Sequence, residues 1–149
     1  MFGFPYNVLY ALRKRKYMSK SFTKQISASL EDYLEVIYEI IDEKHGVKAI
    51  DISRKLGVGR SSVTDALKNL ADKKLVNYGR YEVISLTQEG QEVAKNVIKK
   101  HSVLSEFFTQ ILGLSAEEAD KNACRIEHVI SEAAFDGFTK FMKENKNSK

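Results

Sequence analysis

Two short amphipathic segments joined by a glycine-containing turn restrict the fold more than any other feature of this sequence. They lie within residues 49–76, and Ile52 and Leu56 give the first segment an apolar side. Gly57-Val58-Gly59 allows a tight turn, because glycine adopts backbone conformations that other residues avoid. The second segment repeats apolar residues at helical spacing, namely Val63, Ala66, Leu67 and Leu70. Two helices joined so closely predict a helix-turn-helix.

The residues after these helices predict a β-hairpin. They read VNYGRYEVISL, residues 76–86, and Gly79 can take the first position of the turn. A helix, a turn, a second helix and a hairpin in this order form the winged variant of the motif. The sequence therefore predicts a winged helix-turn-helix.

The second helix of the motif, roughly Arg60–Lys74, is the predicted recognition helix. Hydroxyl side chains allow close approach to a duplex, and Arg and Lys reach base edges or phosphates. The outward-facing candidates for DNA binding are Arg60, Ser61, Ser62, Thr64, Asp65 and Lys68. Arg80 and Tyr81 at the wing tip are further candidates. The alternative is an ordinary solvated helix of a helical bundle, which the turn and the wing together disfavour.

Most of the remaining sequence predicts helices. Residues 29–43 repeat apolar residues at helical spacing, with Ser29 as the expected N-cap. Thr87 can cap a long helix that runs to about Leu112. A capping box that begins at Ser115 starts another helix.

The composition limits the class of protein. A chain of 149 residues with 43% hydrophobic residues suits one compact unit or two small subdomains. A single cysteine excludes an internal disulfide and fits a reducing compartment. Charges interrupt the apolar stretches well before the ~20 residues of a membrane helix. Residues 2–12 are apolar, but their basic residues follow rather than precede them, unlike a secretory signal. We expect a cytoplasmic protein without membrane contact.

The net charge of +4 is unevenly distributed along the chain. Residues 1–28 carry six bases and no acid, and residues 29–43 carry six acids and no base. Residues 44–80 carry nine bases against three acids. Positive and negative blocks suggest a polyanionic partner for one and cations for the other, although many such blocks are only solvated faces.

Three potential metal ligands share one flank of a predicted helix. Cys124, Glu127 and His128 stand at i, i+3 and i+4, and about 100° per residue places them together. Thiolate, carboxylate and imidazole all bind transition metals. A packed cysteine beside surface polar residues is the alternative, and spacing alone does not decide between the two.

Other candidate ligands are ambiguous by themselves. Asp32 and Glu35 lie about 60° apart on the side of their helix opposite the apolar residues, where a solvated acidic face is common. His101 falls on an apolar stripe with Val97 and Leu104, where a histidine is usually part of the core.

Residues 29–142 resemble the diphtheria-toxin-repressor and manganese-transport-regulator family. The resemblance depends on the winged helix-turn-helix followed by KKHSVLSEFF and then ACRIEHVIS. It implies a dimeric repressor that binds palindromic operators on double-stranded DNA when loaded with Fe(II) or Mn(II), usually to control metal uptake.

The resemblance also implies a ligand set of mixed type. The matching positions are Asp32, Glu35, His101, Cys124, Glu127 and His128. Acids at 32 and 35 are typical of the manganese branch, whereas cysteine at 124 is typical of the iron branch. Ser105 stands where the iron branch has a glutamate of its ancillary site, which puts such a site in doubt.

We therefore expect a mainly α fold with a small β-wing, divided into four parts. These are an N-terminal extension (1–23), a DNA-binding domain (24–87), a metal-binding and dimerisation domain (88–142) and a tail (143–149). The apolar surface of the later helices, including the segment Phe135–Phe141, should form the homodimer. Residues 1–17 have no place in the family pattern, and Met18 could be the start of translation.

Two other functions compete with a metal-dependent repressor. A winged-helix regulator that ignores metal would bind DNA equally well in chelator. An enzyme with Cys124 as nucleophile and His128 or His101 as base lacks a third orienting group.

Overall fold

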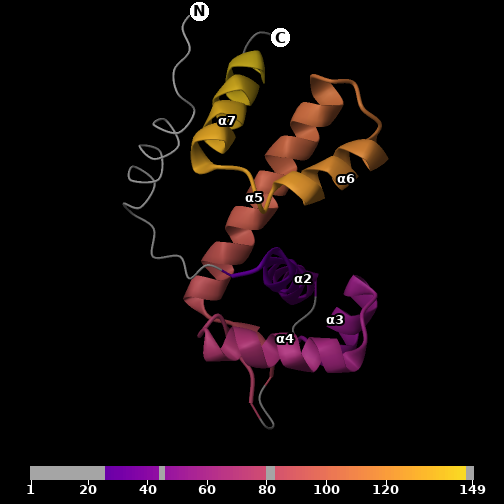
Figure 1. Ribbon diagram of the computed structural model, residues 1–149, viewed down its shortest axis with the longest axis vertical. Helices are drawn as coiled ribbons and strands as arrows, with labels where there is room; N and C mark the ends of the chain where they lie inside the picture. The colour runs from indigo at the N-terminus through magenta and orange to yellow at the C-terminus, as the bar shows by residue number, and fades with distance from the viewer. Residues whose placement is uncertain (1–25, 44–45, 80–82, 147–149) are drawn as a thin grey trace, which may run out of the picture.

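A computed structural model describes residues 26–43, 46–79 and 83–146. These residues form six helices and a two-stranded hairpin, which confirms the predicted fold class. The helix-turn-helix, its wing and α2 form the lower part of the molecule in Figure 1, and α6 and α7 form the upper part. The long helix α5 runs through both parts and connects them. None of the helices in the described ranges is long and apolar enough to span a membrane.

The helix-turn-helix consists of α3 (Ala49–Leu56) and α4 (Arg60–Asp72). Gly57 closes α3 in the left-handed region with a φ of 66°, which explains the need for glycine there. The predicted apolar stripe of α4 is fully buried, and α4 ends two residues before the expected Lys74. Tertiary packing therefore fixes the orientation of α4 and leaves its opposite face to solvent.

The wing is short. Strand β1 (Val76–Asn77) pairs antiparallel with β2 (Ser85–Leu86), with Val76 opposite Leu86. An additional bridge joins Val47 to Ile84 and attaches the hairpin to the segment before α3. Arg80 and Tyr81, the predicted wing-tip contacts, lie outside the described residues.

Helix α2 (Ala28–Glu43) supplies much of the lower core by burying one side. Its N-cap is Ser27 and not Ser29, because the backbone N–H of Leu30 donates to the Ser27 hydroxyl at 3.4 Å. Ser29 is the second residue of α2 and therefore lies inside its first turn. The buried side leaves Glu31, Asp32 and Glu35 outside the centre of the core.

Helix α5 (Gln88–Gln110) begins as predicted at Thr87, whose hydroxyl accepts a hydrogen bond from the Gly90 N–H at 3.0 Å. The same hydroxyl donates to the Lys74 carbonyl at 2.8 Å and so ties α5 to the end of α4. A Cβ at Gly90 would lie 2.0 Å from the Leu75 carbonyl oxygen. Glycine at 90 therefore allows the close contact between α5 and the strand that follows α4.

The upper part has a second, smaller core. Helix α6 (Ala116–Ile126) begins at the predicted cap, where the Ser115 hydroxyl accepts from the Glu118 N–H. Its small residues Ala119 and Ala123 pack on α5, and α7 (Glu132–Lys146) packs on the same helix. Phe107 and Phe138 meet edge to face with ring centroids 4.7 Å apart.

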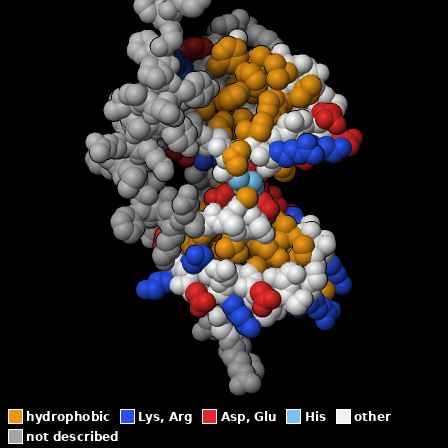
Figure 2. Space-filling view, viewed as in Figure 1, with side chains coloured by type: hydrophobic (Ala, Val, Ile, Leu, Met, Phe, Trp, Pro, Cys, Tyr) orange, Lys and Arg blue, Asp and Glu red, His pale blue; other side chains and the backbone are white. Residues whose placement is uncertain are grey.

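We expected the segment Phe135–Phe141 to be part of an exposed dimer surface. This prediction is wrong for its first residue, Phe135. Phe135 is 3% exposed, because it packs inside the chain beside α5. Phe141 is exposed, as are Ile111, Leu112 and Leu114 around the end of α5. Figure 2 shows a broad apolar face in this upper part.

Candidate metal centre

The site lies between the two parts of the molecule, where α2 meets α5 and the end of α6. Figure 2 shows histidine and acidic side chains together in this waist, between two apolar regions. Five of the six predicted ligands form two groups whose donor atoms lie within 4.8 Å of one another. One group contains His101, Cys124 and Glu127, and the other contains Asp32, Glu127 and His128.

Glu127 belongs to both groups and is the most buried acid of the site, at 2% exposure. One carboxylate oxygen, Oε2, lies 2.8 Å from His101 Nδ1. The other, Oε1, lies 3.3 Å from His128 Nε2. A buried carboxylate needs positive partners, because burial strongly disfavours an unpaired charge. Glu127 therefore connects α5 to the segment that faces α2.

The first group joins α5 to α6. Cys124 Sγ lies 3.7 Å from His101 Nδ1, the nitrogen that also faces Glu127. The other ring nitrogen of His101, Nε2, lies 3.0 Å from Asp120 Oδ1. The thiol, the carboxylate and one imidazole nitrogen thus converge from one side, while Asp120 contacts the opposite nitrogen.

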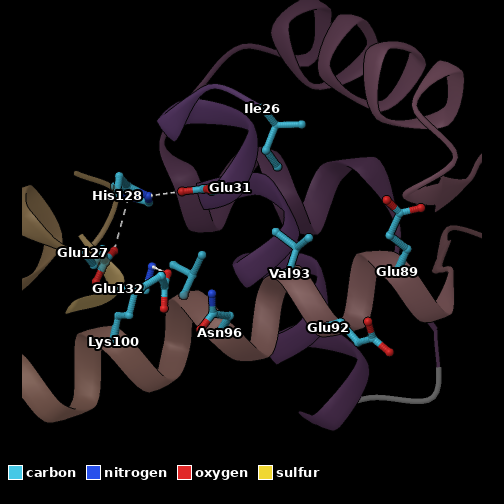
Figure 3. A pocket seen from close by; sticks show the side chains of 11 residues that line it. Ile26, Glu31, Glu89, Glu92, Val93, Asn96, Lys100, Glu127, His128 and Glu132 are labelled. Atoms are coloured by element: carbon cyan, nitrogen blue, oxygen red, sulfur yellow. Dashed lines mark hydrogen bonds and ion pairs between the residues drawn. The ribbon is translucent and has the colours of Figure 1, made fainter. Parts of the chain in front are cut away.

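The second group joins α2 to the turn after α6. His128 Nε2 lies 2.9 Å from Asp32 Oδ1, and its Nδ1 lies 2.6 Å from Glu31 Oε2. Figure 3 shows His128 between Glu31 and Glu127. These contacts attach the metal-domain residue His128 to the first turn of α2, which belongs to the DNA-binding part.

The local backbone separates the predicted triplet into these two groups. Helix α6 ends at Ile126, but the Glu127 backbone remains helical and its N–H donates to the Ala123 carbonyl. Cys124 turns toward α5, whereas His128 turns toward α2. The i, i+3, i+4 spacing predicted that the three side chains lie together on one flank. In the structure only Glu127 belongs to both groups, whereas Cys124 and His128 belong to one group each.

Glu35 is the predicted ligand that belongs to neither group. Burial and the neighbouring charges of Glu127 and Glu39 raise the pKa of Glu35 to about 7. The carboxylate of Glu127 therefore acts on the Glu35 carboxyl group through charge repulsion and not through a hydrogen bond. A cation beside Glu127 would favour the ionised form of Glu35.

The surroundings raise the pKa values of both histidines, of the Cys124 thiol and of Asp32. The hydrogen bond to Glu127 outweighs burial and raises the pKa of His101 to about 9. Burial alone would lower the pKa of His128, but the hydrogen bond to Glu31 and the charge of Asp32 raise it. Burial, with the nearby carboxylates of Glu127 and Asp120, raises the pKa of the Cys124 thiol to about 11. Burial likewise raises the pKa of Asp32, despite His128.

The donor set fits a divalent transition metal. Carboxylate, imidazole and thiol donors come together from three helices, and an imidazole nitrogen lies beside each oxygen of Glu127. Such donors suit ions from Mn(II) to Zn(II). The charge pattern of the waist thus supports a metal site on the chemistry of its own residues.

Sequence reasoning missed two acids of this site, Glu31 and Asp120. Asp120 precedes Cys124 by four residues, so helical spacing could have found it on the same flank. Glu31 gave no such signal, because its partner His128 is 97 residues away. Only the tertiary packing of α2 brings it to the site.

The predicted DNA-binding residues of α4 are mostly exposed. Arg60, Ser61, Ser62, Asp65 and Lys68 face solvent, opposite the buried stripe of the same helix. Thr64 is partly buried, and its hydroxyl donates to the Arg60 carbonyl at 3.0 Å.

Both parts of the chain match models of one protein family. Residues 25–84 match the N-terminal DNA-binding domain of the iron-dependent repressors, and residues 87–148 match their metal-binding and dimerisation domain. The chain belongs to the iron-dependent repressor family. It is therefore a metal-dependent, DNA-binding transcriptional regulator with a dimerisation domain, and the enzyme alternative is excluded.

Individual relatives agree with this family. An uncharacterized HTH-type transcriptional regulator of Methanocaldococcus jannaschii is 36% identical over 82% of this chain and 98% of that protein. The HTH-type transcriptional regulator MntR of Shouchella clausii is 35% identical over 79% of this chain and 84% of its own length.

Solved structures of this repressor family share the fold. The manganese regulator SloR superposes with a TM-score of 0.70 and 28% identity, over 76% of this chain and 53% of its own. IdeR of T. acidophilum superposes with a TM-score of 0.67 and 27% identity, over 83% of this chain and 55% of its own. The chain thus spans just over half the length of these two structures.

Proposed function

We propose that this iron-dependent repressor family member responds to Fe(II) or Mn(II) and, when loaded, binds a palindromic operator as a homodimer, controlling genes of metal-ion uptake. The observation that carries the proposal is the position of Glu127. Its buried carboxylate contacts His101 of α5 and His128, which in turn contacts α2. A metal ion bound at Glu127 would therefore affect both the DNA-binding and the dimerisation part.

The proposed ligands are Asp32, Glu35, His101, Cys124, Glu127 and His128. A bound divalent cation would supply positive charge beside Glu127 and the other carboxylates of this set. The nitrogens of His101 and His128 that bind the cation, and the Cys124 thiol, would have to be free of protons. The hard carboxylates suit Mn(II), and the thiol favours Fe(II) and later metals.

The proposed coupling to DNA runs through α2. Asp32 lies on α2, and α2 packs against α3 and α4 as well as against α5. Ligands contributed by α2, α5 and α6 would hold the DNA-binding part at one angle to the dimerisation part. The distance between the two recognition helices of a dimer would then be fixed, which favours the population that fits two operator half-sites.

The decisive experiment measures DNA affinity against metal. Duplexes would be selected from a randomised library by the full-length protein in Mn(II), and their affinities measured in Mn(II), anaerobic Fe(II) and chelator. We expect affinity to rise at least about tenfold with either metal, a coupling of about 1.4 kcal/mol. Two-fold symmetric selected sequences are expected from a dimer.

Two variants give the control. Glu127→Gln should remove the response to metal, whereas Glu117→Gln removes an exposed acid of α6 and should leave it intact. Equal affinity in chelator and in metal would show a regulator that ignores metal, and selected sites without two-fold symmetry would contradict the palindromic operator.

A further inference from the structure

Glu31 makes a hydrogen bond whose role neither the ligand set nor the family match assigns. It lies in the first turn of α2, next to Asp32. Its Oε2 atom is 2.6 Å from His128 Nδ1, and both side chains are largely shielded from solvent, at 24% and 9% exposure. Figure 3 shows the two side chains pointing toward each other beside a cavity of about 480 Å³. A contact this short between a carboxylate and an imidazole is charge-assisted and therefore strong.

The two nitrogens of His128 face different surroundings. Nε2 points to the candidate donors, 2.9 Å from Asp32 Oδ1 and 3.3 Å from Glu127 Oε1. Nδ1 points away from that group to Glu31. Glu31 therefore contacts the nitrogen that a cation among Asp32, Glu127 and His128 would not use.

We propose that Glu31 is the positioning residue of His128: it accepts a hydrogen bond from Nδ1–H, fixes the orientation of the ring and leaves Nε2 free for the divalent cation. The inference rests on the proposed metal site and names a residue outside its ligand set. Metal-bound histidines commonly donate their second ring N–H to a carboxylate, which fixes the tautomer and strengthens the ligand. A neutral imidazole carries its proton on one nitrogen only, so the acceptor beside Nδ1 determines which nitrogen can bind.

The position of Glu31 gives this role a structural consequence. Asp32 and Glu31 reach the same imidazole from adjacent positions of α2, one on each nitrogen. The ring is thus held against α2 from both sides. Without Glu31, His128 would keep only the partners that compete with the cation for Nε2.

The test compares Glu31→Ala and Glu31→Gln with Asp42→Asn in the full-length protein without DNA. Asp42→Asn removes one exposed acid from the same helix and controls for the loss of charge. Mn(II) affinity would be measured by titration, and the protonated nitrogen of His128 would be identified by ¹⁵N NMR of the Zn(II)-loaded protein. A glutamine oxygen can still accept the Nδ1–H hydrogen bond, so it tests rescue by the conservative variant.

We expect Glu31→Ala to weaken Mn(II) binding roughly 10- to 100-fold. We expect Glu31→Gln and Asp42→Asn to stay within about threefold of the parent. The Nδ1–H proton of His128 should exchange slowly with water in Glu31→Gln and rapidly in Glu31→Ala, where it has no acceptor. Parent-like affinity of Glu31→Ala would overturn the inference, as would an equal loss in Glu31→Gln, which would make Glu31 a ligand. If the parent itself binds neither ion, the proposed metal site fails instead.

Discussion

Glu127 and Cys124 differ in how closely the structure restricts them. Glu127 has a partner on each oxygen and almost no exposure, so loss of its carboxylate would remove a hydrogen-bond partner from both His101 and His128. Cys124 is exposed and contacts the site only through its sulfur, at 3.7 Å from His101 Nδ1. Position 124 can therefore vary in chemistry without disturbing the core, which makes it suited to setting metal preference.

The first prediction at the residue scale concerns metal choice. Cys124→Glu replaces a soft thiolate by a hard carboxylate, and should shift the Fe(II)-to-Mn(II) affinity ratio toward Mn(II) by about tenfold or more. Anaerobic titrations of parent and variant with each ion measure the ratio, and Cys124→Ser separates loss of sulfur from gain of charge. An unchanged or higher ratio in Cys124→Glu would mean that Cys124 is a packing residue.

The second prediction concerns pH. The pKa values of Asp32, Glu35, His101, Cys124 and His128 are all raised in the metal-free fold, so this fold binds more protons than the unfolded chain. The free energy of unfolding should therefore fall as pH rises. The contribution of His101 is fully present below pH 6.5 and is lost as pH rises through about 9.

Thermal unfolding in chelator measures this dependence. We expect Tm to fall between pH 6.5 and 9, and His101→Gln to flatten the fall. Saturating Mn(II) should reverse the slope over the same range, because the metal binds the deprotonated ligands. A metal-free Tm that rises from pH 6.5 to 9 would contradict the assigned proton balance.

At the scale of elements, sequence periodicity was sufficient to predict a helix and its buried face where the helix buries one side. The stripe of α4 and the caps at Thr87 and Ser115 are confirmed, since each depends on residues a few positions apart. The cap of α2 was misplaced by two residues, because Ser27 and Ser29 have the same local chemistry and packing chooses between them. The Glu31–His128 contact could not be predicted, since it depends on how α2 packs against α5. The ligand assignment itself remains a prediction.

Two glycines give a matched stability test. Gly90→Ala should destabilise the protein by about 1–3 kcal/mol, because the added Cβ would collide with the Leu75 carbonyl where α5 begins. Gly137→Ala lies in α7 with nothing within 4 Å of the new Cβ, and should stabilise by roughly 0.5–1 kcal/mol. Denaturant unfolding of both variants measures the difference. Equal effects would show that α5 can move away from β1 at little cost.

The recognition helix gives the fourth prediction. Arg60→Ala and Lys68→Ala should each weaken binding to the selected duplex, because both side chains lie on the exposed face of α4. A lost phosphate contact should also reduce the slope of log affinity against log salt by about 0.9. Lys140→Ala, which removes an exposed base from α7, is the control. Parent-like affinity of both α4 variants at all salt concentrations would mean that another surface contacts DNA.

At the scale of the whole molecule, α5 belongs to both hydrophobic cores. Its first half packs with the DNA-binding core, and its second half packs with α6 and α7. The proposed donors lie at the junction of these two halves, where a bound ion would contact both parts. Among the described residues, four of the seven exposed large hydrophobic residues lie just beyond the end of α5 or on α7, namely Ile111, Leu112, Leu114 and Phe141. The proposed surfaces for DNA binding, metal binding and association would thus follow one another along α5.

The last prediction concerns the dimer surface. Leu112 is 56% exposed and Phe141 is 41% exposed, although both are large apolar residues of the dimerisation domain. Leu112→Lys combined with Phe141→Lys should raise the dimer dissociation constant at least about tenfold, since charges would be buried between the copies. Sedimentation velocity measures the association, and Ile41→Lys, an exposed apolar residue of α2, is the matched control. The double variant should retain Mn(II) binding, because its two residues are not donors, but lose affinity for a two-fold symmetric duplex. A dimer of unchanged strength would place the interface on another face of the helical domain.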